Sequence, residues 1–85
     1  MPAKSVLLEK TASKNLLKLP LNVHQRIINA LDVIKSNPMI GIKLHGELSG
    51  YYKLRVGDYR IVYSFNIKES AVIVVKIEHR QGVYK

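Results

Sequence analysis

Lysines and arginines alternate with apolar residues in the C-terminal half of the chain. The segment Tyr52–Val56 reads Tyr-Lys-Leu-Arg-Val, and Lys76 and Arg80 follow a valine-rich run. Alternate residues of a β-strand point to the same face of its sheet, so this spacing would gather positive charges on one surface. Ammonium and guanidinium groups gathered in this way can bind a phosphate and stabilise negative charge that develops on it.

The overall charge indicates an acidic partner. The 85 residues include 14 Lys and Arg but only 6 Asp and Glu, which gives a formal net charge of +8. A hydrophobic content of 47% with 24% charged residues is typical of a folded domain and not of a disordered basic tail. The sequence therefore predicts one folded domain over residues 1–85 that binds nucleic acid, an anionic membrane or an acidic protein.

Several kinds of site are excluded by what the sequence lacks. Without cysteine, the chain has no disulfide, thiolate nucleophile or Cys-based metal site. The histidines are His24, His45 and His79, and no two of them are four residues apart, so we expect no metal site and no cofactor. The longest apolar run, Ala71–Val75, is far shorter than a membrane span, and Met1–Lys10 does not resemble a signal peptide. We therefore expect a cytoplasmic protein. A membrane partner is not expected either, because membrane-surface sites are usually basic amphipathic helices with exposed large apolar residues, whereas the helices of this chain are expected to bury their apolar faces in the core.

Apolar periodicity and turn residues predict helices between strands. The short apolar segment Lys4–Glu9 predicts a first strand. Two helices are expected next, one over Ser13–Leu19 that ends at Pro20, and one that is capped by Asn22 and ends at Asn37-Pro38. A connecting loop over Gly41–Gly50 and three strands are expected to follow, at Tyr51–Val56, Tyr59–Asn66 and Ala71–Arg80.

The links between the last three strands are short, so these strands are expected to form an antiparallel meander. The two amphipathic helices must bury their apolar sides against one face of the sheet. The predicted fold is therefore α+β, an antiparallel sheet with two N-terminal helices packed on one face, in the order β-α-α-β-β-β. Strict alternation in the last strand puts Ile73, Val75, Ile77 and His79 on one face and Val74, Lys76, Glu78 and Arg80 on the other.

If the more apolar side of each strand faces the helices, the opposite, open face of the sheet collects the cations. Such a face can bind a nucleic-acid backbone, while a nearby aromatic ring can stack on a base. The same pattern also fits cations that merely keep an open sheet face in contact with water. The residues expected on this face are Lys53, Arg55, Arg60, Lys76 and Arg80, with Tyr51 beside them.

Two motifs resemble the RelE/ParE superfamily of bacterial and archaeal toxins. They are Lys43-Leu44-His45-Gly46 leading into the run Tyr52–Tyr63, and the closing Glu78-His79-Arg80-Gln81-Gly82-Val83-Tyr84. The RelE branch cuts messenger RNA in the ribosomal A site, whereas the ParE branch poisons DNA gyrase. The resemblance also implies a toxin–antitoxin hetero-oligomer with a cognate acidic RelB-like antitoxin.

In RelE-like nucleases a cluster of Lys and Arg with a C-terminal tyrosine cuts RNA without a metal, by attack of the 2′-hydroxyl on phosphorus. The resemblance implies that Lys53, Arg60, Arg80 and Tyr84 are the catalytic residues here. Because neighbouring cations favour the neutral form of a lysine, Lys53 is the candidate base, and Arg60 and Arg80 would stabilise the transition state. RNA-binding roles are expected for Arg55, Lys76, Tyr51 and His79.

Some alternatives stay open. His79 has a side chain suited to acid–base catalysis, but alternation puts it on the face opposite Arg80, which favours a structural role. Glu78 is expected to pair with a neighbouring cation. The leading functional hypothesis is a ribosome-dependent endoribonuclease that inhibits translation. The alternatives are a gyrase inhibitor without hydrolytic activity and an inactive module that only binds an antitoxin.

Overall fold

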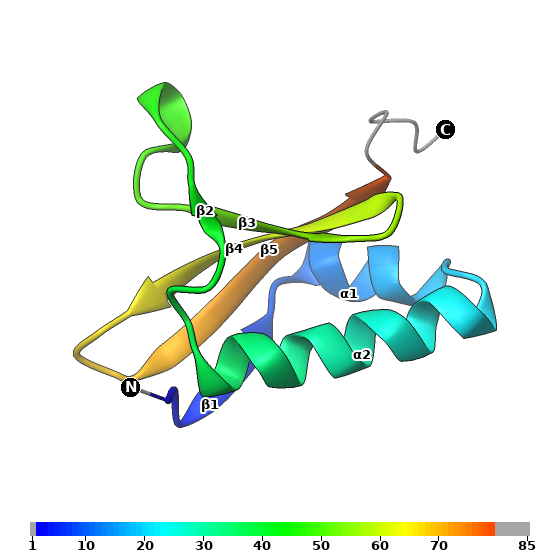
Figure 1. Cartoon of the computed structure of the whole chain (residues 1–85), viewed down its shortest axis with the longest axis horizontal. Coiled ribbons are helices and arrows are strands. Elements are labelled where there is room, and N and C mark those ends of the chain that lie inside the picture. Colours follow the sequence, from blue (N-terminus) through cyan, green and yellow to red (C-terminus); the bar gives the residue numbers. More distant parts are fainter. Residues whose placement is uncertain (1, 80–85) are drawn as a thin grey trace.

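Two helices and a β-sheet form the fold in the computed structural model, which describes residues 2–79. The order of elements agrees with the predicted β-α-α-β-β-β arrangement, so the α+β fold class is confirmed (Figure 1). The elements are β1 Ser5–Leu8, α1 Lys10–Leu17, α2 Leu21–Ser36, β2 Ile42–Lys43, a 3₁₀ turn η1 at Gly46–Leu48, β3 Tyr52–Val56, β4 Tyr59–Asn66 and β5 Ala71–His79.

The strands described in residues 2–79 form one sheet in the order β1-β5-β4-β3-β2. The predicted antiparallel meander is present in β3, β4 and β5, where short turns fix the strand directions. Strand β1 instead pairs parallel with β5, so the sheet is mixed. No short turn constrains β1, because two helices separate it from the rest of the sheet. The expected loop Gly41–Gly50 also contains β2, which pairs with β3, and the turn η1.

The helix boundaries differ from the predicted ones. Helix α1 begins at Lys10, three residues before the expected start, and ends at Leu17, two residues before the expected Leu19. The predicted capping of α2 by Asn22 is wrong, because the helix already begins at Leu21 and Pro20 occupies the N-cap position without a side-chain hydrogen bond. The Pro20 carbonyl accepts a hydrogen bond from the His24 N–H at 2.8 Å, which makes the first helical turn.

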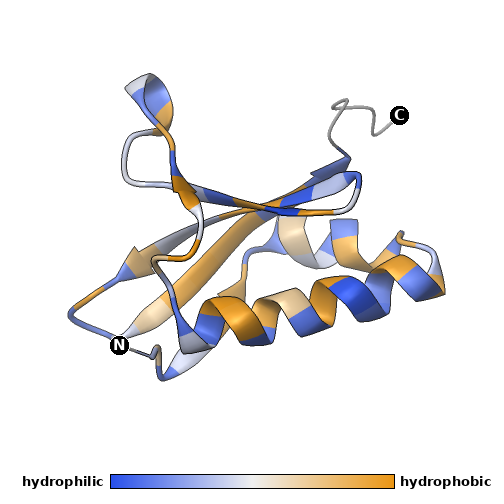
Figure 2. Ribbon diagram, viewed as in Figure 1, coloured by the Kyte–Doolittle hydropathy of each residue, from blue (hydrophilic) through white to orange (hydrophobic). Residues whose placement is uncertain are grey.

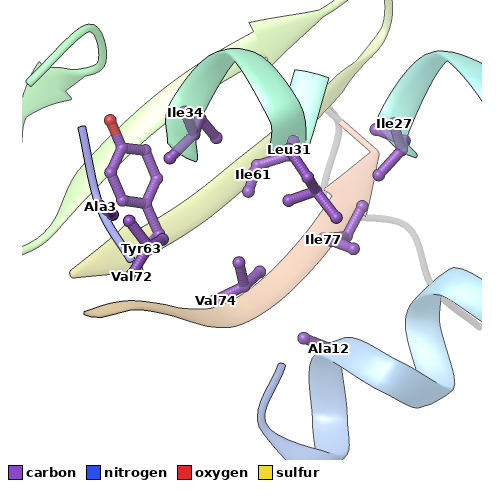
Figure 3. Packing of buried hydrophobic residues seen from close by; sticks show 10 residues of the cluster. All are labelled: Ala3, Ala12, Ile27, Leu31, Ile34, Ile61, Tyr63, Val72, Val74 and Ile77. Carbon is purple, nitrogen blue, oxygen red and sulfur yellow. The ribbon is translucent and has the colours of Figure 1, made fainter. Parts of the chain in front are cut away.

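The hydrophobic core lies between the helices and one face of the sheet, as predicted. Figure 3 shows side chains from α1 and α2 pointing toward those of β4 and β5. In Figure 2, β5 is hydrophobic along most of its length, whereas α2 has both hydrophobic and hydrophilic residues along its axis. The core cluster comprises Ala3, Ala12, Ile27, Leu31, Ile34, Ile61, Tyr63, Val72, Val74 and Ile77.

A β-bulge interrupts the alternation of β5. Val62 pairs with Lys76, but its neighbour Tyr63 pairs with Val74, so Val75 is the extra residue. The prediction that strict alternation would put Val74 on the open face is therefore wrong, and Val74 is fully buried in the core together with Ile77. The bulge lets apolar residues on both sides of Val75 reach the helices while Lys76 remains on the open face.

Helix α1 covers the part of β5 that β1 does not reach. The pairing of β1 with β5 ends at Leu8 and Val74. Farther along β5, the backbone N–H of Ile77 donates a hydrogen bond of 3.1 Å to the side-chain Oδ1 of Asn15 in α1. The helix thus satisfies an N–H group that the sheet edge would otherwise leave without a strand partner. None of the helices within residues 2–79 is long and apolar enough to cross a membrane.

Candidate functional site

The open face of the sheet has a hollow of about 130 Å³. Its floor comes from the three strands of the meander, and its wall comes from the segment that connects β2 to β3. We call it the cationic hollow. It is lined by Leu44, Leu48, Lys53, Arg60, Val62, Lys76 and Glu78.

Strand register brings the cations together. Val62 in β4 pairs with Lys53 in β3 on one side and with Lys76 in β5 on the other. One pair farther along the open face, Arg60 lies between Arg55 of β3 and Glu78 of β5. Neighbouring strands are about 4.8 Å apart, so the long side chains of Lys53, Arg60 and Lys76 line the same hollow. Arg55 lies on the same face but is not one of the lining residues. The predicted placement of these four cations on one sheet face is thus confirmed.

Glu78 is the only charged residue of the described chain that is buried, with a relative exposure of 8%. Its Oε2 accepts a hydrogen bond of 3.3 Å from a guanidinium nitrogen of Arg60, and its Oε1 lies 3.1 Å from Nζ of Lys76. The expected pairing of Glu78 with a cation is confirmed. The carboxylate holds two cations of neighbouring strands in place and offsets part of their charge.

Leucine side chains give the hollow an apolar wall. Leu44 and Leu48 stand over the open face, and Val62 below is only 3% exposed. Sequence reasoning missed both leucines because they lie in a segment without strand or helix periodicity. An apolar wall beside a cationic floor suits a ligand that has both a flat hydrophobic part and a negative charge, as a nucleotide does.

Two tyrosines fix the strand that carries Lys53. The buried Tyr63 hydroxyl donates a hydrogen bond of 2.8 Å to the Pro38 carbonyl and accepts one of 3.0 Å from the Gly41 N–H. Its ring stacks on Tyr52, with centroids 5.4 Å apart. Burial raises the pKa of Tyr63 above its ordinary value of 10.0, although the hydrogen bond from Gly41 acts in the opposite direction.

Gly41 is packed too closely for a larger residue. A Cβ atom there would lie 2.7 Å from the Tyr63 hydroxyl and 2.8 Å from the Lys53 carbonyl oxygen. The chain that leaves α2 therefore passes directly against the backbone of Lys53. This contact ties the core to the edge of the cationic hollow.

Other predicted site residues lie apart from the cationic hollow. Tyr51 lines a separate hollow of about 340 Å³ with Lys43 and His45. His79 lies on the helix side of the sheet, where its ring meets that of Tyr59 edge-on with centroids 5.1 Å apart. Arg80 and Tyr84 lie outside the described residues. Of the predicted catalytic residues in residues 2–79, the structure brings together Lys53 and Arg60.

The cationic hollow can bind a phosphodiester, since it offers the guanidinium of Arg60 and the ammonium groups of Lys53 and Lys76. No three His, Asp or Glu side chains within residues 2–79 form a group that could hold a metal ion.

The whole-chain comparison identifies the family. Residues 6–84 match the family described as the ParE toxin of type II toxin–antitoxin systems. The chain belongs to this family. The resemblance to the RelE/ParE superfamily, first suggested by the motifs Lys43–Gly46, Tyr52–Tyr63 and Glu78–Tyr84, is confirmed.

Toxins from a bacterium and an archaeon are similar to this chain over most of its length. It is 29% identical over 77 residues to the toxin RelG of Mycobacterium tuberculosis, covering 88% of each protein. It is 31% identical over 84 residues to the toxin RelE3 of Methanocaldococcus jannaschii, covering 93% of each. The chain is thus a toxin of the type II toxin–antitoxin class, in the RelE/ParE family.

Solved toxin–antitoxin complexes share the fold. The toxin–antitoxin complex RelBE2 of Mycobacterium tuberculosis contains a chain that superimposes with a TM-score of 0.85 at 28% identity, covering 94% of this chain and 100% of that chain. The RelE–RelB complex of Pyrococcus horikoshii gives a TM-score of 0.74 at 27% identity, covering 98% of this chain and 100% of that chain.

Proposed function

We propose that this toxin is a ribosome-dependent endoribonuclease that cuts messenger RNA in the ribosomal A site and so inhibits translation. The observation that carries the proposal is that Lys53, Arg60 and Lys76 line one hollow on the open face of the sheet. Relatives named RelE add support, because the RelE branch of the superfamily has this activity.

The reaction requires three tasks from the protein. The 2′-hydroxyl must lose a proton as it attacks phosphorus, negative charge on the phosphorus oxygens must be stabilised, and the leaving 5′-oxygen must gain a proton. Arg60 is suited to the charge, because its donors match phosphate oxygens. Lys53 is suited to proton transfer. The products are a 2′,3′-cyclic phosphate and a 5′-hydroxyl.

Other residues have supporting roles in this proposal. Arg55 and Lys76 hold the RNA backbone, and Tyr51 contacts a neighbouring nucleotide from its own hollow. His79 stabilises the sheet through Tyr59. Arg80 and Tyr84 are proposed to complete the catalytic group on the strength of the family motif.

The proposed partners are the ribosome with its messenger RNA and an acidic RelB-like antitoxin, which places the toxin in the cytoplasm. A toxin with a net charge of +8 attracts an acidic antitoxin segment, and the solved relatives are described as toxin–antitoxin complexes.

Cleavage of ribosome-bound message tests the proposal. Purified toxin is added to ribosomes programmed with a defined message, and primer extension maps new ends in the A-site codon. Arg60→Ala is expected to reduce the cleavage rate by about 10² to 10³, the cost of one lost donor to a developing oxyanion. Lys68→Ala, in the exposed turn between β4 and β5, is the matched control and should cut at the wild-type rate. Wild-type toxin that leaves the message intact would contradict the proposal.

A second candidate is inhibition of DNA gyrase without hydrolysis, which the description of the matching family as ParE favours. Purified toxin would then block supercoiling by gyrase, and Lys53→Ala would leave this inhibition unchanged. If neither cleavage nor inhibition occurs and expression does not arrest growth, the third hypothesis holds, an inactive module that binds only an antitoxin.

A further inference from the structure

The groups that line the cationic hollow differ in whether they can accept a proton near neutral pH. Lysine and arginine side chains ordinarily carry their protons at this pH. Glu78, held in ion pairs with Arg60 and Lys76, is a carboxylate and has free lone pairs on both oxygens. Among the described residues that line the hollow, Glu78 is therefore the only ready proton acceptor.

The strands that carry Glu78 and Lys53 lie on opposite sides of the strand that carries Arg60. Glu78 pairs with Arg60 itself, whereas Lys53 pairs with Val62, so Lys53 lies diagonally across β4 from Glu78. Lys53 belongs to β3, Arg60 to β4 and Glu78 to β5, and these strands are adjacent in the sheet (Figure 1). Two strand spacings separate β3 from β5 by about 10 Å. A phosphorus atom bound in the hollow over Arg60 and Val62 would thus have the Glu78 carboxylate on its β5 side and the Lys53 ammonium group on its β3 side.

This arrangement matches the geometry of in-line displacement at phosphorus, in which the attacking and leaving oxygens stand on opposite sides. It also gives each kind of group a role that suits its chemistry, since a carboxylate can take a proton and an ammonium group can give one. Proton transfer in the opposite direction, with Lys53 as the base, would need a lysine that has first lost its own proton.

We propose that Glu78 is the general base of the cleavage reaction and that Lys53 is its general acid. The 2′-oxygen gives its proton to the Glu78 carboxylate as it bonds to phosphorus. The bond between phosphorus and the 5′-oxygen breaks, and the 5′-oxygen takes a proton from the Lys53 ammonium. Proton exchange with water then restores both groups. This inference rests on the proposed nuclease function and reverses the proton transfer that the sequence predicted for Lys53.

A substrate with sulfur in place of the bridging 5′-oxygen separates the two roles. A thiolate leaves readily without being protonated, so this substrate no longer needs a general acid but still needs a base. Ribosomes are programmed with short messages that carry either oxygen or sulfur at the scissile position, and single-turnover cleavage is followed. Glu69→Gln and Lys68→Ala, both in the exposed turn between β4 and β5, are matched controls expected to cut at the wild-type rate.

Glu78→Gln is expected to cut both substrates about 10² to 10⁴ times more slowly than wild type, the usual contribution of a general base. Lys53→Ala should show a similar loss with the oxygen substrate and a rate close to wild type with the sulfur substrate. Binding of a message that carries a 2′-methoxy group at the cleavage site is measured separately. A folding defect would weaken this binding. Glu78→Gln should bind this message at least as tightly as wild type, because the substitution removes a negative charge from the hollow.

Two cleavage results would overturn the inference while leaving the nuclease function intact, and so would one binding result. One is wild-type cleavage of the oxygen substrate by Glu78→Gln. The other is recovery of Glu78→Gln, and not of Lys53→Ala, on the sulfur substrate. Impaired binding of the 2′-methoxy message by Glu78→Gln would also overturn it, because the loss of cleavage would then reflect a structural role. If wild-type toxin and Arg60→Ala both leave the oxygen and sulfur substrates uncut, the result contradicts the proposed nuclease function itself.

Discussion

The two faces of the sheet are formed by the same strands but differ in burial and charge. On the helix side, residues such as Ile61 and Ile77 are fully buried among apolar neighbours from α1 and α2. On the open side, Arg60 and Lys76 keep 34% and 43% of their side chains exposed around the cationic hollow. Stability and ligand binding are therefore carried by alternate residues of the same strand, so single substitutions should affect one with little effect on the other.

The largest expected difference between the faces concerns folding. Ile61→Ala would leave a cavity in the core and lower the free energy of unfolding by about 2 to 5 kcal/mol. Arg55→Ala removes an exposed side chain of the open face and should change the free energy of unfolding by no more than about 0.5 kcal/mol. Urea denaturation of both variants measures the contrast. Equal losses of stability would mean that the open face also takes part in the core.

Tyr63 lies on the helix side but is linked to the strand of Lys53, so it tests whether the two faces are independent. Tyr63→Phe removes the hydroxyl that bridges the Pro38 carbonyl and the Gly41 N–H, and should cost about 1 to 3 kcal/mol of stability. The loss is measured by urea denaturation, with Tyr51→Phe as the control because Tyr51 lies outside the core cluster.

The pH dependence of stability provides a second test of Tyr63. Its pKa is raised in the folded protein, mainly by burial, so the folded state favours the protonated phenol. The corresponding stability is fully present below pH 10.0, the ordinary pKa, and is lost as the pH rises through the higher folded-state value. Wild type should therefore lose more stability than Tyr63→Phe when the pH is raised above this value. Parallel pH profiles for the two proteins would contradict this explanation.

The parts of the fold that follow from local patterns could be predicted from the sequence. The order of elements, the bounds of β4 and the four cations on one face depend on short turns and strand periodicity. The bulge at Val75 could not be predicted, because Ile73, Val74 and Val75 are all apolar and either alternation satisfies the pattern. The parallel pairing of β1 with β5 depends on how two helices fold back, which no local signal specifies.

The candidate site was predicted less completely than the fold. Lysines and arginines were found because charge in a strand is conspicuous, and the pairing of Glu78 followed from its position among them. The sequence did not reveal that Glu78 is buried between two cations, since burial depends on the side chains of neighbouring strands. Leu44 and Leu48 were missed because only the path of the β2–β3 connection brings them over the hollow.

The smallest expected effect concerns the charge of the open face, measured through RNA binding by the toxin alone. Each cation that neutralises a phosphate of single-stranded RNA contributes about 0.7 to the slope of log affinity against log salt concentration. Lys53→Ala should therefore reduce the magnitude of this slope by about 0.7, a modest change that needs binding isotherms at several salt concentrations.

Lys68→Ala carries the same change in net charge on an exposed turn away from the hollow, so it should leave the slope unaltered. If both variants lower the slope equally, RNA responds to the total charge of +8 and not to the cationic hollow. A loss confined to Lys53→Ala would instead locate phosphate contacts on the open face, because the two variants differ only in where the charge is removed.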